Sequence, residues 1–336
     1  MNMAENIRSE DLIKAEEKKE TSINTIPFYK LFSFADATDK ILMFFGTAGA
    51  TGNGLCQVLV AVLFGDLIDS FGLNKTSDVL QAVSKEMMNK MGIYLIQYDR
   101  SGYGESDPNP KRSLRSEASD IEELADNLQL GSKFYIICSS MGCYPTWGCI
   151  KHIPHRLAGV AFVVPIVNYQ WPSLPHNLTK DDQRKKDYWL MTMTAKYIPK
   201  LLQWWAIRKT STNDPKTTYF TSKDLEIIKN LPGFQGFSPE KLRNRSIFNN
   251  LCSDFLVAFS SWDFDPSELS NPFPENGQSC VHIWQGSEDK VINLKIQRHI
   301  AERLPWIQYH EVPNNGHLLI YDTTVCEAIL RSLLIG

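Results

Sequence analysis

The sequence lacks several features that mark common protein classes. Neither sign of charge dominates, because 35 Lys and Arg residues stand against 38 Asp and Glu residues, so no nucleic-acid partner is expected. No two of the seven cysteines form a C-x-x-C pair, which argues against a zinc site or a disulfide framework. No G-x-x-x-x-G-K-[ST] loop is present either, which excludes ATP hydrolysis by a P-loop. What remains is a chain of 336 residues whose 43% apolar content is enough for a sizeable core.

The first residues are polar and rich in both charges. Residues 1–24 are therefore expected to form a solvated, poorly ordered tail. They are not expected to be a signal peptide, because the start is not basic and no apolar run follows within reach.

The next segment, Ile41–Gly65, has 25 residues without a charged side chain. As a helix rising about 1.5 Å per residue, it would cross the roughly 30 Å hydrocarbon core of a bilayer. Gly46, Ala50 and Gly54 recur at four-residue spacing, which favours close contact with another helix. Two interpretations stay open: a transmembrane helix that associates the chain with a membrane, or a buried segment of a soluble fold.

From about residue 77 the pattern alternates between helices and strands. The expected helices are 77–91, 114–128, 144–152, 296–304 and 325–334, and the expected strands are 93–98, 134–138, 160–167, 281–285 and 307–312. Most of these strands are continuous apolar runs, so we predict an α/β fold with a parallel sheet covered on both faces. Residues 168–278 break the alternation and are rich in Trp, Pro and helical pattern, which predicts an inserted cap.

A candidate nucleophile follows the strand expected at 134–138. A reactive serine needs a tight strand-to-helix turn, with small residues two positions before and two positions after it. Ser140 has Gly142 after it, but Cys138 stands where the pattern has glycine. We expect the Cys138 side chain to strain or displace the turn slightly.

An acid and a base follow later strands in the order that this chemistry requires. A serine needs a base to take its proton and a carboxylate to orient that base. Asp289 follows the strand expected at 281–285, and His317 follows the strand expected at 307–312. The neighbouring Glu288 competes with Asp289, which we favour for its spacing to the apolar pair after it.

Residues 99–106, together with Ser140, Asp289 and His317, resemble an α/β-hydrolase. The runs 103–110, 154–159 and 271–274 resemble plant α/β-hydrolase-fold proteins, and the similarity covers about residues 83–336. The resemblance implies hydrolysis of a small-molecule ester or an acylglycerol through an acyl-enzyme, with no metal or organic cofactor. Ser140 would attack, His317 would act as base and then acid, and Asp289 would orient His317.

The same resemblance indicates a deficit in this chain. Hydrolases of this group have eight strands in the order 1-2-4-3-5-6-7-8, and only strands 4 to 8 are evident here. The Met141 N–H would supply one oxyanion donor, while the His-Gly loop after strand 3 that supplies the other is not evident. Losing one donor costs about 10²–10³ in turnover. Residues 58–65 offer an alternative third strand, which competes with the membrane helix for the same residues.

The N-terminal part resembles a different family. Residues 27–32 and 64–72 resemble the start of a plant multidrug-type ABC exporter, over about residues 25–80. The chain therefore looks like a fusion, natural or from a faulty gene model, joined within residues 77–90. Three hypotheses follow: a serine hydrolase, a non-catalytic pseudohydrolase, or a membrane-associated fusion product without transport activity.

Tryptophans in the expected cap allow two interpretations. Trp189, Trp204 and Trp205 lie among aliphatic residues. They form either an apolar acyl pocket over Ser140 or the core of the cap.

Overall fold

A computed structural model describes residues 92–210, 220–230, 239–273 and 280–334. All of them belong to the larger of two compact units, residues 56–336. The expected tail 1–24, the exporter-like segment 25–80 with Ile41–Gly65, the alternative strand 58–65 and the helix 77–91 lie outside the described residues. Within the described residues, no helix combines the length and apolar character needed to cross a membrane.

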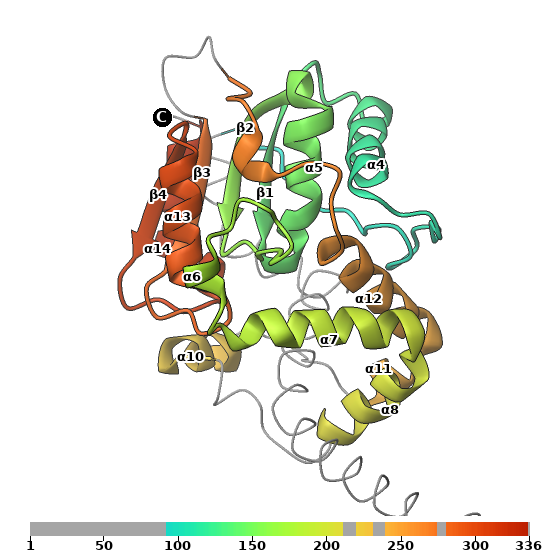
Figure 1. The fold of residues 1–336 in the computed structure, drawn as a ribbon. Coiled ribbons are helices and arrows are strands. Elements are labelled where there is room, and N and C mark those ends of the chain that lie inside the picture. Colours follow the sequence, from blue (N-terminus) through green and yellow to red (C-terminus); the bar gives the residue numbers. More distant parts are fainter. Residues whose placement is uncertain (1–91, 211–219, 231–238, 274–279, 335–336) are drawn as a thin grey trace, which may run out of the picture. The chain divides into compact units, whose positions relative to one another are not determined.

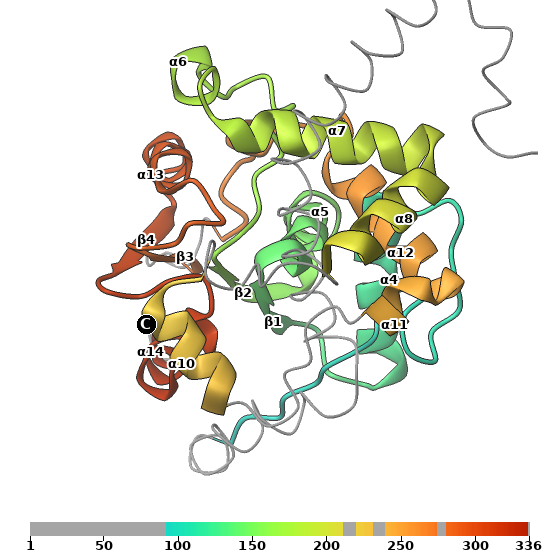
Figure 2. The same ribbon diagram turned by 90° about the horizontal axis from the view of Figure 1, so that it is seen from below.

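The described strands form one parallel sheet. Its strands are β1 (Phe134–Ser139), β2 (Leu157–Val163), β3 (Val281–Gly286) and β4 (Ile307–Val312), hydrogen-bonded in the order β1-β2-β3-β4. β3 is buried along its whole length, because helices cover both faces of the sheet. Helix α13 (Leu294–Arg303) packs on β3 and β4, while α14 (Thr323–Leu334) packs on β2 and β3 from the opposite side (Figure 2). This arrangement confirms the predicted parallel α/β sheet.

Two helices lie at the β1 side of the sheet, and the turn after β1 leads directly into the second of them. A capping box between Ser113 and Ser116 starts helix α4 (Leu114–Asn127). Helix α5 (Tyr144–His152) follows β1 through a short 3₁₀ turn, η2 (Ser140–Cys143), and packs against α4 (Figure 1). A second 3₁₀ turn, η3 (Pro154–Arg156), leads into β2.

Residues 164–280, here called the helical insertion, connect β2 to β3. Its described helices are α6 (His176–Thr179), α7 (Gln183–Tyr197), α8 (Pro199–Thr210), α10 (Ser222–Asn230), α11 (Pro239–Arg243) and α12 (Arg245–Ala258), followed by the 3₁₀ turn η4 (Pro266–Glu268). The Asp182 side chain caps α7, and the Asn244 side chain caps α12. α7 packs on α8 and α12, and α11 packs on the same two helices (Figure 1).

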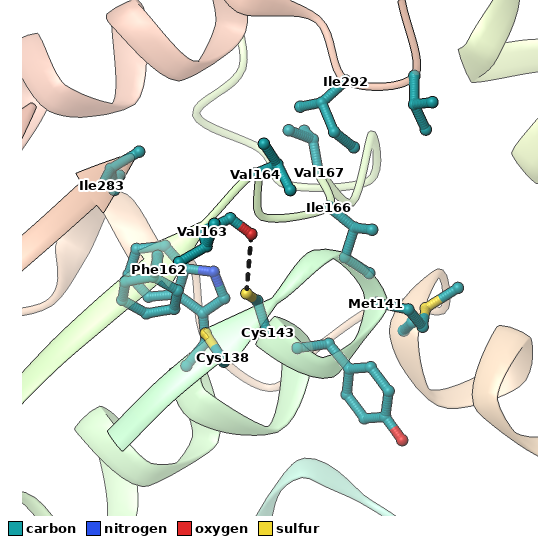
Figure 3. Close-up of a cluster of buried hydrophobic side chains, with 14 of the residues drawn as sticks. Cys138, Met141, Cys143, Phe162, Val163, Val164, Ile166, Val167, Ile283 and Ile292 are labelled. Atoms are coloured by element: carbon teal, nitrogen blue, oxygen red, sulfur yellow. Dashed lines mark hydrogen bonds between the residues drawn. The ribbon is translucent and has the colours of Figure 1, made fainter. Parts of the chain in front are cut away.

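The core beneath the turn after β1 is tightly filled. Figure 3 shows Cys138, Met141 and Cys143 packed with apolar residues of β2 and the segment after it. The Cys143 thiol donates to the carbonyl of Val163 at 3.8 Å. Behind them Trp147 of α5 stacks on Phe162 of β2, with ring centroids 4.4 Å apart. Such packing leaves the start of η2 little room to move.

A buried ion cluster joins the helical insertion to the helices beside β1. Asp254 of α12 accepts hydrogen bonds from Arg100 Nη1 and Nη2, at 3.1 and 2.9 Å, and from the Tyr103 hydroxyl at 2.6 Å. It also contacts Arg112 and the hydroxyl of Tyr144 on α5. Burial alone would raise the pKa of Asp254, but Arg100 and Arg112 hold it below its usual value.

The strand expected at 93–98 is not formed. A strand exists only where a neighbour completes its hydrogen bonds, and no described residue pairs with this segment. Tyr94 is 83% exposed, so the run is not buried on both faces as its apolar character predicted.

Candidate active site

Ser140 lies where β1 turns into η2. Its φ is +49°, a left-handed conformation that is costly for a residue other than glycine and that marks a tight, over-determined turn. The Ser140 carbonyl accepts a hydrogen bond from the Ile166 N–H at 3.3 Å, which ties the turn to the segment after β2. The Ser140 side chain is fully buried.

The residues on either side of Ser140 bear on the expectations for Cys138 and Gly142. Cys138 pairs in regular register with Phe162, and the only irregularity in the β1–β2 ladder lies between Phe134 and Tyr135. The β1 strand is therefore in register up to Ser139, and the turn itself is strained at Ser140, where φ is positive. Among the described residues, no atom lies within 4 Å of a Cβ added at Gly142.

The structure brings His317 and Asp289 to Ser140. His317 Nε2 lies 2.9 Å from Ser140 Oγ, although 177 residues separate them in sequence. His317 Nδ1 lies 2.8 Å from Asp289 Oδ2. An ionised carboxylate has no proton to give, so Nδ1–H donates to Asp289 and Nε2 is left to accept the Ser140 hydroxyl proton.

Asp289 is held in place by three further donors. Its Oδ1 accepts the N–H groups of Val291 and Ile292 at 2.7 and 3.0 Å, and its Oδ2 accepts the Gln285 side-chain amide at 2.9 Å. Glu288 is exposed instead. The structure thus places Asp289, rather than Glu288, against the histidine.

The loops that carry Asp289 and His317 touch each other directly. A Cβ at Gly286, the last residue of β3, would lie 2.3 Å from the Gly316 carbonyl oxygen. A Cβ at Gly316 would lie 1.9 Å from an oxygen of Asp224. Both positions need glycine because backbone or carboxylate fills the space of a side chain.

Sequence reasoning missed Gln285 and Asp224. Gln285 lies four residues before Asp289, and this spacing in the sequence does not predict its hydrogen bond to Asp289 Oδ2. Asp224 lies 93 residues before His317, and it accepts hydrogen bonds from the backbone of the loop around His317. Nothing in the local pattern around Asp224 marks this contact.

Met141 lies buried directly after Ser140. It is at the start of the helical run formed by η2 and α5. The first N–H groups of a helix have no acceptor within the helix, and the Met141 N–H is one of these groups.

Two of the expected cap tryptophans do not belong to the core of the cap. Trp189 is 61% exposed and Trp204 is 54% exposed, so the core interpretation is wrong for these residues. The buried face of α7 includes Tyr188, Met191 and Ala195. Trp189 is exposed because its position along the helix places it on another face. Trp205 is partly buried and packs on the main core.

No metal-binding group is found in the part of the chain that the structure describes. There, no three His, Cys, Asp or Glu side chains are close enough to hold an ion. Another described histidine, His310, is on β4 and stacks on Trp284.

A model of the serine aminopeptidase S33 family matches residues 70–324, about three quarters of the chain. The chain belongs to this family. Among solved structures, this S33 family member is similar to a hydrolase from Oleispira antarctica, with a TM-score of 0.52 and 18% identity over 79% of this chain and 86% of that one. It is also similar to a structure from a study of carboxylesterases of Nitrososphaera gargenis, with a TM-score of 0.51 and 13% identity over 76% and 85% of the two chains. These similarities confirm the α/β-hydrolase fold.

The N-terminal region matches different proteins. ABC transporter B family member 21 of Arabidopsis thaliana is 55% identical over 62 residues, which are 18% of this chain and 5% of the transporter. ABC transporter B family member 3 of Dictyostelium discoideum is 35% identical over 92 residues, 27% and 6% of the two chains. The exporter resemblance is confirmed over this short stretch, and the S33 family member spans about a twentieth of the length of these curated relatives.

Proposed function

We propose that this protein is a serine hydrolase that cleaves carboxylic esters through an acyl-enzyme. The observation that supports this most is the relay from Ser140 through His317 to Asp289, with contacts of 2.9 and 2.8 Å. A serine hydroxyl is a weak nucleophile until a base accepts its proton, and the base works best when a third group orients it.

The reaction follows from these contacts. Ser140 Oγ attacks the ester carbonyl carbon while its proton passes to His317 Nε2, and Asp289 stabilises the imidazolium that forms. His317 then gives this proton to the departing alcohol, which leaves the acyl group on Ser140. A water molecule, deprotonated by His317, attacks the acyl carbonyl, and the acid is released as Ser140 regains its proton.

The charge on the tetrahedral intermediate needs donors. We assign one of them to the Met141 N–H, on account of its position at the start of the helical run after Ser140. The His-Gly loop that supplies the second donor in this group is not evident in the sequence, and the alternative third strand at residues 58–65 lies outside the described residues. With Met141 as the sole donor, turnover would fall by about 10²–10³ relative to a complete oxyanion hole.

The relay favours catalysis over the pseudohydrolase alternative. Three side chains from distant parts of the sequence meet at hydrogen-bond distance, and Gln285, Val291 and Ile292 keep the acid in place. The carboxylesterase study among the structural neighbours supports a small-molecule ester as the substrate class.

Labelling by a small dialkyl fluorophosphonate tests the proposal on the full chain. Wild-type protein and Ser139→Ala should take the label, because Ser139 is the last residue of β1 and lies outside the relay. Ser140→Ala should take none, and hydrolysis of p-nitrophenyl butyrate should follow the same order. A folded wild-type protein that is neither labelled nor active on the ester contradicts the proposal. Faster cleavage of an aminoacyl p-nitroanilide than of the ester would favour a peptidase instead.

We also propose, from the sequence alone, that Ile41–Gly65 associates with a membrane. Flotation of the full chain with phospholipid vesicles tests this. The wild-type chain and Leu128→Lys, a change at a half-exposed site, should float, whereas Leu59→Lys should float less. Equal flotation of all three, or of none, contradicts membrane association through this segment.

A further inference from the structure

A buried carboxylate of the helical insertion holds the backbone of the loop that carries His317. Asp224, on α10, is 1% exposed. Its Oδ2 accepts the His317 N–H at 3.2 Å, and its Oδ1 accepts the Leu318 N–H at 2.8 Å. Two consecutive N–H groups thus bind the two oxygens of one carboxylate.

The start of α10 orients this carboxylate. Asp224 Oδ2 accepts the N–H of Thr221 at 2.9 Å and its hydroxyl at 3.0 Å, while the Asp224 N–H donates to that hydroxyl at 3.1 Å. This reciprocal pattern is a capping box, which starts the helix and fixes the carboxylate at once. Four donors therefore surround a charge that would be costly to bury without them.

Gly316 shows that the contact determines the shape of the loop. A Cβ at Gly316 would lie 1.9 Å from Asp224 Oδ2, so the carboxylate occupies the place of a side chain. Two residues earlier, Asn314 has a φ of +56°, a left-handed conformation that asparagine tolerates. The turn after β4 is thus closed around Asp224.

We propose that Asp224 is a positioning residue for the general base. By holding the His317 and Leu318 backbone, it keeps His317 Nε2 within hydrogen-bond reach of Ser140 Oγ. The inference rests on the role proposed above for His317. Misplacing a reacting group by about 1 Å can cost about 10²-fold in rate, so the helical insertion contributes to the geometry of the reaction.

Lys223 offers a matched control on the same helix. Its ammonium group lies 2.7 Å from Asp322 Oδ2, so it also attaches α10 to the segment after β4. Both views place α10 on the side of the insertion near α14, away from α8 and α11 (Figures 1 and 2). Lys223→Gln removes this ion pair and leaves the Asp224 contacts in place.

The experiment compares Asp224→Asn with Lys223→Gln in the full chain. Residue-resolved hydrogen exchange should be at least tenfold faster at the His317 and Leu318 amides in Asp224→Asn, because an amide group has one acceptor oxygen where the carboxylate has two. We expect wild-type exchange in Lys223→Gln. The fluorophosphonate labelling rate and the kcat for the ester should fall about 10²-fold in Asp224→Asn alone, with KM unchanged. If Asp224→Asn does not fold, Gly316→Ala disturbs the same contact from the loop side and should give the same pattern.

The outcomes separate this inference from the proposed function. Unchanged exchange at both amides in Asp224→Asn overturns the inference. Faster exchange with an unchanged labelling rate also overturns it, because Asp224 would then be structural only. If wild-type protein takes no label, the proposed function fails, and the low-field signal of the His317 Nδ1 proton decides the inference. That signal must shift or vanish in Asp224→Asn and persist in Lys223→Gln; no change in either variant refutes the positioning role.

Discussion

His282 of β3 and His310 of β4 lie side by side in the sheet, with His282 Nδ1 3.0 Å from His310 Nε2. The His282 side chain is 1% exposed. Burial, and then the neighbouring His310, lower the pKa of His282 to about 4, and burial lowers the pKa of His310 as well. We predict that this pair makes the stability of the fold depend on pH in the mildly acidic range.

The sign and size follow from proton linkage. An unfolded histidine titrates near pH 6.5, so between about pH 6.5 and 4 the unfolded state binds more protons than the folded state. The free energy of unfolding therefore rises with pH across this window, and the contribution of the histidines to stability is lost as the pH falls. For His282 alone, a folded-state pKa of about 4 corresponds to about 2 kcal/mol lost between pH 7 and pH 5.

Urea unfolding of wild-type protein and His282→Phe at both pH values measures this quantity. Phenylalanine keeps a ring beside His310 but takes up no proton. Groups elsewhere titrate alike in both proteins and cancel, so wild-type protein should lose about 2 kcal/mol more than the variant between pH 7 and pH 5. Equal losses in the two proteins would refute the reasoning, whatever the stability of the variant at pH 7.

Two other substitutions test the interactions around the sheet. Asp254→Asn should lower the unfolding free energy by about 3–5 kcal/mol, because Arg100 and Arg112 stay buried without their carboxylate; a loss below about 1 kcal/mol in urea unfolding would contradict this. Asp289→Asn should lower the kcat for p-nitrophenyl butyrate by about 10⁴-fold with KM unchanged, because a neutral amide favours the wrong tautomer of His317. A decrease of less than tenfold would argue against the proposed role of Asp289.

Local pattern predicts much of the α/β region. The strand expected at 307–312 has the bounds of β4, and the helix expected at 144–152 has those of α5. The prediction was less accurate for β2, expected at 160–167 and found at Leu157–Val163. Val164 has a φ of +43°, which ends the strand and turns the chain toward Ser140. A β-branched residue in that conformation is held there by its surroundings, so no local pattern indicates it.

The sequence alone predicts the order of Ser140, Asp289 and His317, because each follows an expected strand. Their meeting at 2.9 and 2.8 Å is a property of the folded chain. The same holds for Asp224, whose contact with the His317 loop spans 93 residues, and for the outward face of α7 that carries Trp189. Periodicity and turn residues determine local structure over a few positions, so helices and strands can be predicted from short stretches of sequence. Contacts between distant segments depend on which faces pack together. The segment at 93–98 is not a strand, because a strand requires a partner and no described segment pairs with it.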